Sequence, residues 1–160
     1  MMTDPTATDT AARIGDTDVV GARALAQIVD ALVTIVLFAS LAGGLVLLLA
    51  GPAAIRGAPL LAVLMVGSPA MVLAGAVASL YPVVLEWRWD GQTVGKRVAG
   101  IRVVARDGGP IGPGSALSRN VFAAVDAAFF YLVGLAAMAT SPDRQRVGDR
   151  VAGTVVVRSR

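Results

Sequence analysis

Residues 23–30 read Arg-Ala-Leu-Ala-Gln-Ile-Val-Asp, and they lead into an apolar run that continues to Ala50. Arg23 and Asp30 are seven residues apart, close to two turns of an α-helix, so both side chains project from one stripe of the predicted helix. A charged side chain near the middle of a bilayer costs about 2.5–3.5 kcal/mol. The two charges therefore predict a helix face that meets polar partners.

The composition of the 160-residue chain is that of a membrane protein. Hydrophobic residues make up 56% of it, charged residues 16%, and the mean hydropathy is +0.71. The chain has no cysteine and no histidine, which excludes disulfides, thiolate metal sites and an imidazole base. We expect a protein that is not an enzyme, with no catalytic residue, no cofactor and no metal site.

Three apolar runs are predicted to enter the membrane. Residues 28–50 and 60–85 each exceed the ~20 residues that a helix needs to cross the hydrocarbon core, and residues 120–140 are just long enough. Trp87 and Trp89, beside charged residues, indicate a membrane boundary after the second run. Residues 1–20 lack the basic start and apolar core of a signal peptide, and they predict a disordered polar tail before a membrane domain at residues 21–158.

Two patterns occur twice in the same order. Arg119 and Asp126 repeat the seven-residue spacing of Arg23 and Asp30 near the start of the third run, and residues 94–104 agree with residues 147–157 at eight of eleven positions. The Val-rich end of each copy predicts a short strand, at about residues 100–106 and 153–158. The residues of interest in the repeated motif are Gly95, Lys96, Arg97 and Gly100 in the first copy, and Gly148, Asp149, Arg150 and Gly153 in the second.

The distribution of basic residues predicts the topology. Arg56 is the single basic residue between the first two runs, so the positive-inside rule places the amino end and the central loop in the cytoplasm. A full crossing by the third run would put a basic tail outside and separate the two strands. A re-entrant pair of short helices that turns near Gly134 avoids both problems, and we favour it. The predicted fold is an α-helical integral membrane protein with two full transmembrane helices, a third membrane helix or re-entrant helical pair, and a small cytoplasmic strand pair.

Over residues 19–158 the chain resembles the RDD family of bacterial membrane proteins, which is named for one arginine and two aspartates. The resemblance rests on Arg23 and Asp30, on Gly91-Gln-Thr-Val-Gly-Lys-Arg and Gly100-Ile-Arg-Val-Val, on Arg119-Asn120 with Asp126, and on Gly148-Asp-Arg with Ala152-Gly-Thr. Arg23 and Asp30 correspond to the arginine and the first aspartate, whereas Asp126 and Asp149 are both candidates for the second. The resemblance implies a multi-pass protein of the bacterial inner membrane, with transport as the expected role and cation–proton exchange proposed for some members.

Two functions remain open. In a transporter, membrane-embedded carboxylates would bind a proton or cation, because burial raises a carboxylic pKa and a nearby arginine lowers it. The repeat then predicts crossed pairs, Arg23 with Asp126 and Arg119 with Asp30. In an accessory or scaffold subunit of a larger complex, the same pairs would be structural. An intramembrane aspartic protease is disfavoured because an arginine shares the stripe of each aspartate.

The expected partners follow from the same features. The lipid bilayer surrounds the apolar runs, and cytoplasmic arginines are suited to anionic lipid. One copy with two full spans has little room for a solute path, so we expect a homo-oligomer or a larger membrane complex. Nucleic acid is not expected, because the sequence has no basic face interleaved with aromatic residues.

Overall fold

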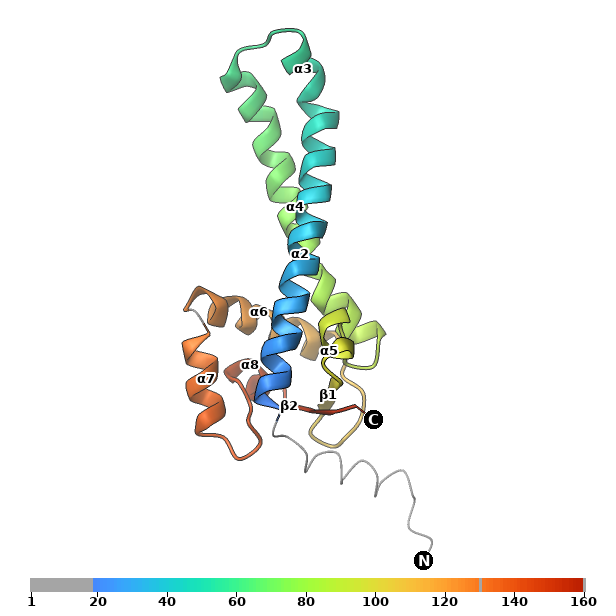
Figure 1. The fold of residues 1–160 in the computed structure, drawn as a ribbon, viewed down its shortest axis with the longest axis vertical. Helices are drawn as coiled ribbons and strands as arrows, with labels where there is room; N and C mark the ends of the chain where they lie inside the picture. The colour runs from blue at the N-terminus through green and yellow to red at the C-terminus, as the bar shows by residue number, and fades with distance from the viewer. Residues whose placement is uncertain (1–18, 130, 160) are drawn as a thin grey trace, which may run out of the picture. The chain divides into compact units, whose positions relative to one another are not determined.

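The computed structural model describes residues 19–129 and 131–159, and within them the chain is mostly helical (Figure 1). The predicted tail, residues 1–20, falls almost entirely on residues outside this range and stays a prediction. The elements in chain order are α2 (Val20–Leu49), α3 (Gly51–Ile55), α4 (Leu60–Arg88), α5 (Val94–Val98), β1 (Ile101–Ala105), α6 (Pro113–Ala128), α7 (Leu132–Ala139), α8 (Val147–Val151) and β2 (Thr154–Arg158).

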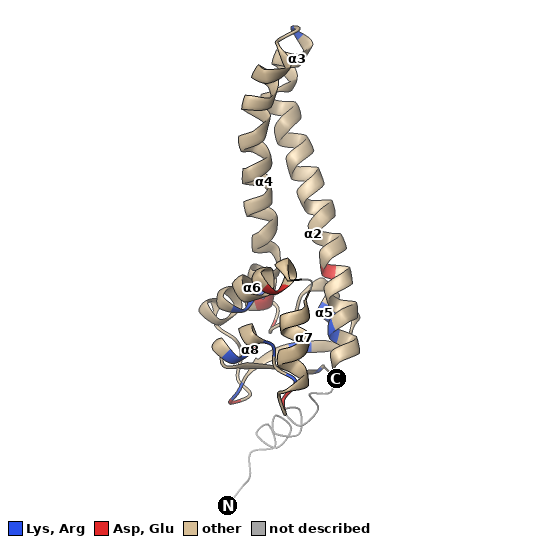
Figure 2. Ribbon diagram, turned by 90° about the vertical axis from the view of Figure 1, so that its left-hand side faces the viewer, with Lys and Arg blue, Asp and Glu red and all other residues tan. Residues whose placement is uncertain are grey.

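Helices α2 and α4 confirm the first two predicted membrane runs. They contain 30 and 29 residues and are apolar and long enough to cross a membrane. Helix α2 begins eight residues before the predicted run at residue 28 (28 − 20 = 8), because the helix includes the polar turns that precede the apolar residues. Figure 2 shows that charged residues are absent along most of both helices.

Residues 31–81 form one compact unit, made of the larger parts of α2 and α4 and the short α3 between them. A Cβ built on Gly67 would lie 3.8 Å from the side chain of Val46, and one built on Gly75 would lie 3.7 Å from that of Phe38. Both distances are those of ordinary van der Waals contacts, so an alanine at either position would pack against α2 without strain. Arg56 is the one charged residue of this unit.

The second unit contains residues 82–159 and the start of α2, through Asp30. Strands β1 and β2 pair in antiparallel register, with Val103 opposite Val156, which confirms the predicted strand pair. The core beside the strands consists of Val19, Ala26, Ile101, Val103, Ile111, Ala116 and Val156. A smaller buried cluster contains Val104, Val155 and Val157, so the two-stranded sheet is buried on both faces.

The two motif copies have the same local structure. Each is a five-residue helix, α5 or α8, followed by a five-residue strand. Gly100 and Gly153 join helix to strand with φ of 65° and 63°, a left-handed conformation that favours glycine. Equivalent positions in the copies are 53 residues apart, and Val103 pairs with Val156 (156 − 103 = 53). The two motif copies are therefore related by a local two-fold axis that passes through the Val103–Val156 pair. Their contact resembles the contact between the two subunits of a symmetric dimer.

Candidate functional site, a buried charge cluster

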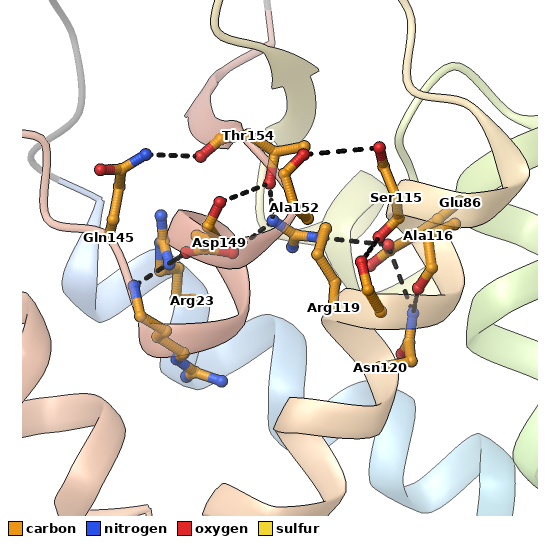
Figure 3. Close-up of polar contacts among 12 residues, drawn as sticks. Arg23, Glu86, Ser115, Ala116, Arg119, Asn120, Gln145, Asp149, Ala152 and Thr154 are labelled. Atoms are coloured by element: carbon orange, nitrogen blue, oxygen red, sulfur yellow. Dashed lines mark hydrogen bonds and ion pairs between the residues drawn. The ribbon is translucent and has the colours of Figure 1, made fainter.

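Asp149 is the carboxylate at which the two repeated arginines meet. Arg23 Nη1 donates to Asp149 Oδ2 at 2.7 Å, and Arg119 Nη1 forms an ion pair with Oδ1 of the same carboxylate (Figure 3). The backbone N–H of Arg146 also donates to Asp149 Oδ2, at 3.0 Å, at the start of α8. The side chains of Arg23 and Asp149 are only 6% and 4% exposed. The carboxylate thus joins α2, α6 and α8 inside the protein.

The surroundings of Asp149 keep it ionised. Burial by itself would raise the pKa of this carboxyl, but the charges of Arg119 and Arg23, with the hydrogen bonds from Arg23 and the Arg146 amide, lower its pKa from 3.8 to about 2. At neutral pH Asp149 is therefore a fixed negative charge. A residue with this pKa is suited to holding helices together and poorly suited to carrying a proton.

Glu86 extends the cluster to the first copy of the motif. Its carboxylate forms an ion pair with Lys96 Nζ and lies 3.4 Å from Arg119 Nε, and it is 2% exposed. Lys96 and Asp149 occupy equivalent positions of the repeat (149 − 96 = 53), so the two copies contribute opposite charges. The result is a continuous chain of ion pairs, Arg23–Asp149–Arg119–Glu86–Lys96.

Asp30 lies at the start of α5. Its carboxylate accepts hydrogen bonds from Thr93 Oγ1 at 2.5 Å and from the Gly95 N–H at 2.8 Å. Thr93 is the N-cap of α5, where unpaired N–H groups and the helix dipole favour a negative charge. A Cβ on Gly95 would lie 2.1 Å from the carbonyl oxygen of Ala26. The Asp30 carboxylate on α2 therefore holds α5 against α2. The helices are so close at Gly95 that a residue with a Cβ would not fit there.

Asp126 lies at a break between two helices. Its Oδ1 accepts the N–H of Gly134 in the first turn of α7 at 2.6 Å, while its buried Oδ2 has no hydrogen-bond partner in the part of the chain that the structure describes. Helices α6 and α7 are bent by 113° with respect to each other. The predicted turn near Gly134 corresponds to the break between Ala128 and Leu132, and Gly134, in the first turn of α7, is the residue against which Asp126 packs.

The predicted crossed pairing, Arg23 with Asp126 and Arg119 with Asp30, is wrong. Both arginines instead form ion pairs with Asp149, and Arg119 also pairs with Glu86. The prediction considered only the helices that carry the Arg-x6-Asp pattern. It did not include the short helices α5 and α7, whose N-terminal N–H groups donate to Asp30 and Asp126.

The other motif residues have packing roles or lie near the surface. Arg97 stacks on Trp89, 4.1 Å from the ring centroid, and Arg150 Nη2 donates to the carbonyl of Ala137 at 2.9 Å. A Cβ on Gly148 would lie 2.9 Å from Phe122 Cβ, so α8 contacts α6 closely there. Within the described residues, no group of three or more acidic side chains is placed to hold a metal ion.

Sequence reasoning missed two glutamines that the repeat also contains. Gln92 Nε2 donates to the carbonyl of Ile101 at 3.1 Å, and Gln145 Nε2 donates to the carbonyl of Thr154 at 2.7 Å. Both pairs of positions differ by 53 residues (145 − 92 and 154 − 101). The signal was present in the sequence as Asp-x-Gln, which stands at residues 90–92 and 143–145 just before each motif.

Two long apolar helices, a bent helix pair and a buried chain of ion pairs define an integral membrane protein with internal charge partners. The model of the RDD family matches residues 18–153, and the chain belongs to this family. Over 84 residues it is 32% identical to the uncharacterized protein YckC of Bacillus subtilis (strain 168). That alignment spans 50% of this chain and 56% of the Bacillus protein. No solved structure matches the chain.

Proposed function

We propose that this protein moves a small solute or cation across the bacterial inner membrane, with Asp126 as the group that binds and releases a proton or cation. The observation that carries the proposal is the buried Oδ2 of Asp126, which has no hydrogen-bond partner among the described residues. A buried carboxylate with an unsatisfied oxygen is costly when ionised, and protonation or cation binding removes this cost. The break between α6 and α7 resembles the discontinuous helices at which many transporters bind ions.

The other two candidate aspartates are less suited to this role. Asp149 is held ionised by two arginines. The carboxylate of Asp30 accepts two hydrogen bonds at the start of α5. Asp30 and Asp126 accept hydrogen bonds from the N–H groups of different helices, α5 and α7, and we propose no enzymatic role.

The exposed surfaces of α2 and α4 suggest how a transport path would be built. Most of the apolar residues on both helices are exposed in a single copy, including Leu32, Val36, Leu64 and Val72. Lipid covers such surfaces, or another protein does. Because two membrane-spanning helices can line only a small part of a solute path, we propose that the transporter is a homo-oligomer.

The strand pairing supports a re-entrant α6–α7 pair. Paired strands lie on one side of a membrane, and β1 follows the second span while β2 follows α7. The chain between them then enters and leaves on the same side, which the positive-inside rule assigns to the cytoplasm. At that side Arg88 lies 4.8 Å from the Trp87 ring and Arg97 lies 4.1 Å from the Trp89 ring, an arrangement suited to anionic lipid headgroups.

Cysteine labelling tests the orientation against a background free of native cysteine. We expect Ser159→Cys in spheroplasts to react with a membrane-impermeant maleimide only after permeabilisation, because the tail is cytoplasmic. Arg56→Cys, in the loop between the two spans, is the matched control and should react in intact spheroplasts. Labelling of Ser159→Cys in intact spheroplasts would show that the third segment crosses the membrane fully.

Proton-coupled flux tests the role of Asp126. In liposomes loaded with a pH-sensitive dye, we expect the wild-type protein to move protons when a Na⁺ or K⁺ gradient is applied, and Asp126→Asn to fall to the background rate. The asparagine oxygen can still accept the Gly134 N–H, so the helix break should persist. Asp143→Asn, at a partly exposed carboxylate, is the control and should retain flux. Equal rates for Asp126→Asn and wild type would remove Asp126 from the mechanism, and a wild type without cation-dependent flux would count against transport.

The second candidate is an accessory or scaffold subunit. The ion pairs from Arg23 to Lys96 favour it, because a chain of buried ion pairs fixes helices in one arrangement. Purification in a mild detergent distinguishes the two candidates. A symmetric homo-oligomer supports transport, whereas a stable larger partner supports the scaffold.

A further inference from the structure

One edge of the Arg23 guanidinium carries two buried donors without acceptors. Nη1 donates to Asp149 and lies 3.9 Å from Met138 Sδ, whereas Nε and Nη2 have no hydrogen-bond partner among the described residues. The N–H bonds of Nε and Nη2 point in parallel from one side of the planar group. This edge matches the two oxygens of a carboxylate or phosphate, and such bidentate pairs are among the strongest hydrogen bonds in proteins.

A second arginine, Arg146, lies close enough to Arg23 for their charges to interact. Arg146 Nη1 donates to Gln27 Oε1 at 3.2 Å, and Gln27 Nε2 donates to the Tyr131 hydroxyl at 3.1 Å. Gln27 is one helical turn from Arg23 on the same face of α2. The Nε atom of Arg146 is also buried and without a partner in the described part of the chain. Arg23 and Arg146 therefore both carry unused buried donors, and Gln27 accepts from Arg146 one helical turn away from Arg23.

The charge balance at this region favours an anion. Asp149 carries one negative charge and is shared between Arg23 and Arg119, which also pairs with Glu86, so it neutralises Arg23 only in part. Arg146 adds a third positive charge close to Arg23. An unpaired donor on a buried cation has a high desolvation cost, and an oxyanion would satisfy both donors of the Arg23 edge at once.

We propose that the Nε and Nη2 edge of Arg23 binds an oxyanion, the carboxylate or phosphate group of a small molecule or of a lipid headgroup. In this structure the edge is closed, because both atoms are inaccessible to solvent. A shift of α7, whose Met138 Sδ lies 3.9 Å from Nη1 of the same guanidinium, would open the edge. The inference concerns binding and does not require that the protein transports anything.

Thermal unfolding with added oxyanion tests the site in the full chain. In an uncharged detergent at constant ionic strength, inorganic phosphate or acetate should raise the Tm in a saturable manner, by about 5 °C near saturation. A parallel series in lipid nanodiscs compares phosphatidylcholine alone with added phosphatidylglycerol. Arg23→Lys keeps a positive charge for Asp149 but has no parallel donors, so it should lose the rise. Arg106→Lys, at an exposed arginine paired with Asp143, is the control and should keep it.

The outcomes separate the two sources of the oxyanion. A rise with phosphate or acetate in detergent indicates a soluble ligand, and a rise with phosphatidylglycerol alone indicates a lipid headgroup. Either supports the site when Arg23→Lys abolishes it. No rise for the wild type in both series, or an equal rise in Arg23→Lys, overturns the proposal. If Arg23→Lys does not fold, the test is the amide hydrogen-exchange rate of α7 in the wild-type protein, measured with and without the oxyanion. A bound oxyanion should slow this exchange, and an unchanged rate refutes the site.

Discussion

Asp149→Asn is expected to destabilise the protein by about 3–5 kcal/mol, the usual effect of removing one partner from a buried ion pair. The Asp149 carboxylate forms ion pairs with both Arg23 and Arg119, and the Asp149 side chain is 4% exposed. Asparagine has nearly the same shape and can still accept the Arg146 N–H, so the loss reports the charge rather than a cavity. The midpoint of chemical unfolding in detergent micelles, with unchanged slope, measures the effect.

Asp143→Asn provides the matched control for this change. Asp143 pairs with Arg106 at 3.3 Å, but the two side chains are 38% and 66% exposed. An exposed ion pair contributes less than about 1 kcal/mol, so this variant should unfold close to the wild-type midpoint. Similar midpoints for both asparagine variants would mean that the convergence of two arginines on Asp149 does not stabilise the fold.

The pH dependence gives a second measure of the same carboxylate. The pKa of Asp149 is lowered from 3.8 to about 2 on folding, so its stabilising effect is complete above pH 3.8 and is lost as the pH falls through about 2. Across this window the wild type should lose about 2 kcal/mol more stability than Asp149→Asn, which has no proton to gain there. Parallel stability curves for the two proteins between pH 4 and pH 2 would contradict the assignment.

The repeat made much of this site predictable from the sequence. An arginine followed seven residues later by an aspartate occurs at Arg23 and again at Arg119, which indicated a repeated structural element. The repeated Val-rich runs predicted strands that pair. Spacing within one helix defines a face, however, and it does not identify the partner that meets that face. The partner Asp149 lies on α8, a five-residue helix too short to show helical periodicity.

The remaining differences also have local physical reasons. Glu86 stands beside Trp87 at a predicted membrane boundary, and nothing in the sequence singles it out; in the structure it is 2% exposed and forms ion pairs with Lys96 and Arg119. The break between α6 and α7 has no glycine or proline to indicate it. Tyr131 adopts the left-handed conformation there, with φ of 60°, which is uncommon for a residue with a side chain.

Gly95→Ala is expected to destabilise the protein by about 3 kcal/mol, through overpacking and through the loss of a hydrogen bond to a charged group. The added Cβ would lie 2.1 Å from the Ala26 carbonyl oxygen and 2.8 Å from Asp30 Cγ. A backbone oxygen within a helix cannot move aside by itself, so α5 would have to move away from α2. This shift would break the bond between the Gly95 N–H and Asp30 and would displace Lys96 from Glu86.

Two further glycines turn this expectation into a test of the repeated architecture. A Cβ on Gly148, the equivalent position of the second copy, would meet Phe122 Cβ at 2.9 Å and the Arg119 carbonyl oxygen at 3.1 Å, so Gly148→Ala should cost less than Gly95→Ala. A Cβ on Gly114 meets nothing within 4 Å, and alanine there should be neutral or stabilise α6 by up to about 1 kcal/mol. Unfolding midpoints in one detergent should rank Gly95→Ala lowest, then Gly148→Ala, then Gly114→Ala. If Gly95→Ala and Gly148→Ala both match Gly114→Ala, the motif glycines do not act as close helix contacts, and the repeat needs a different physical explanation.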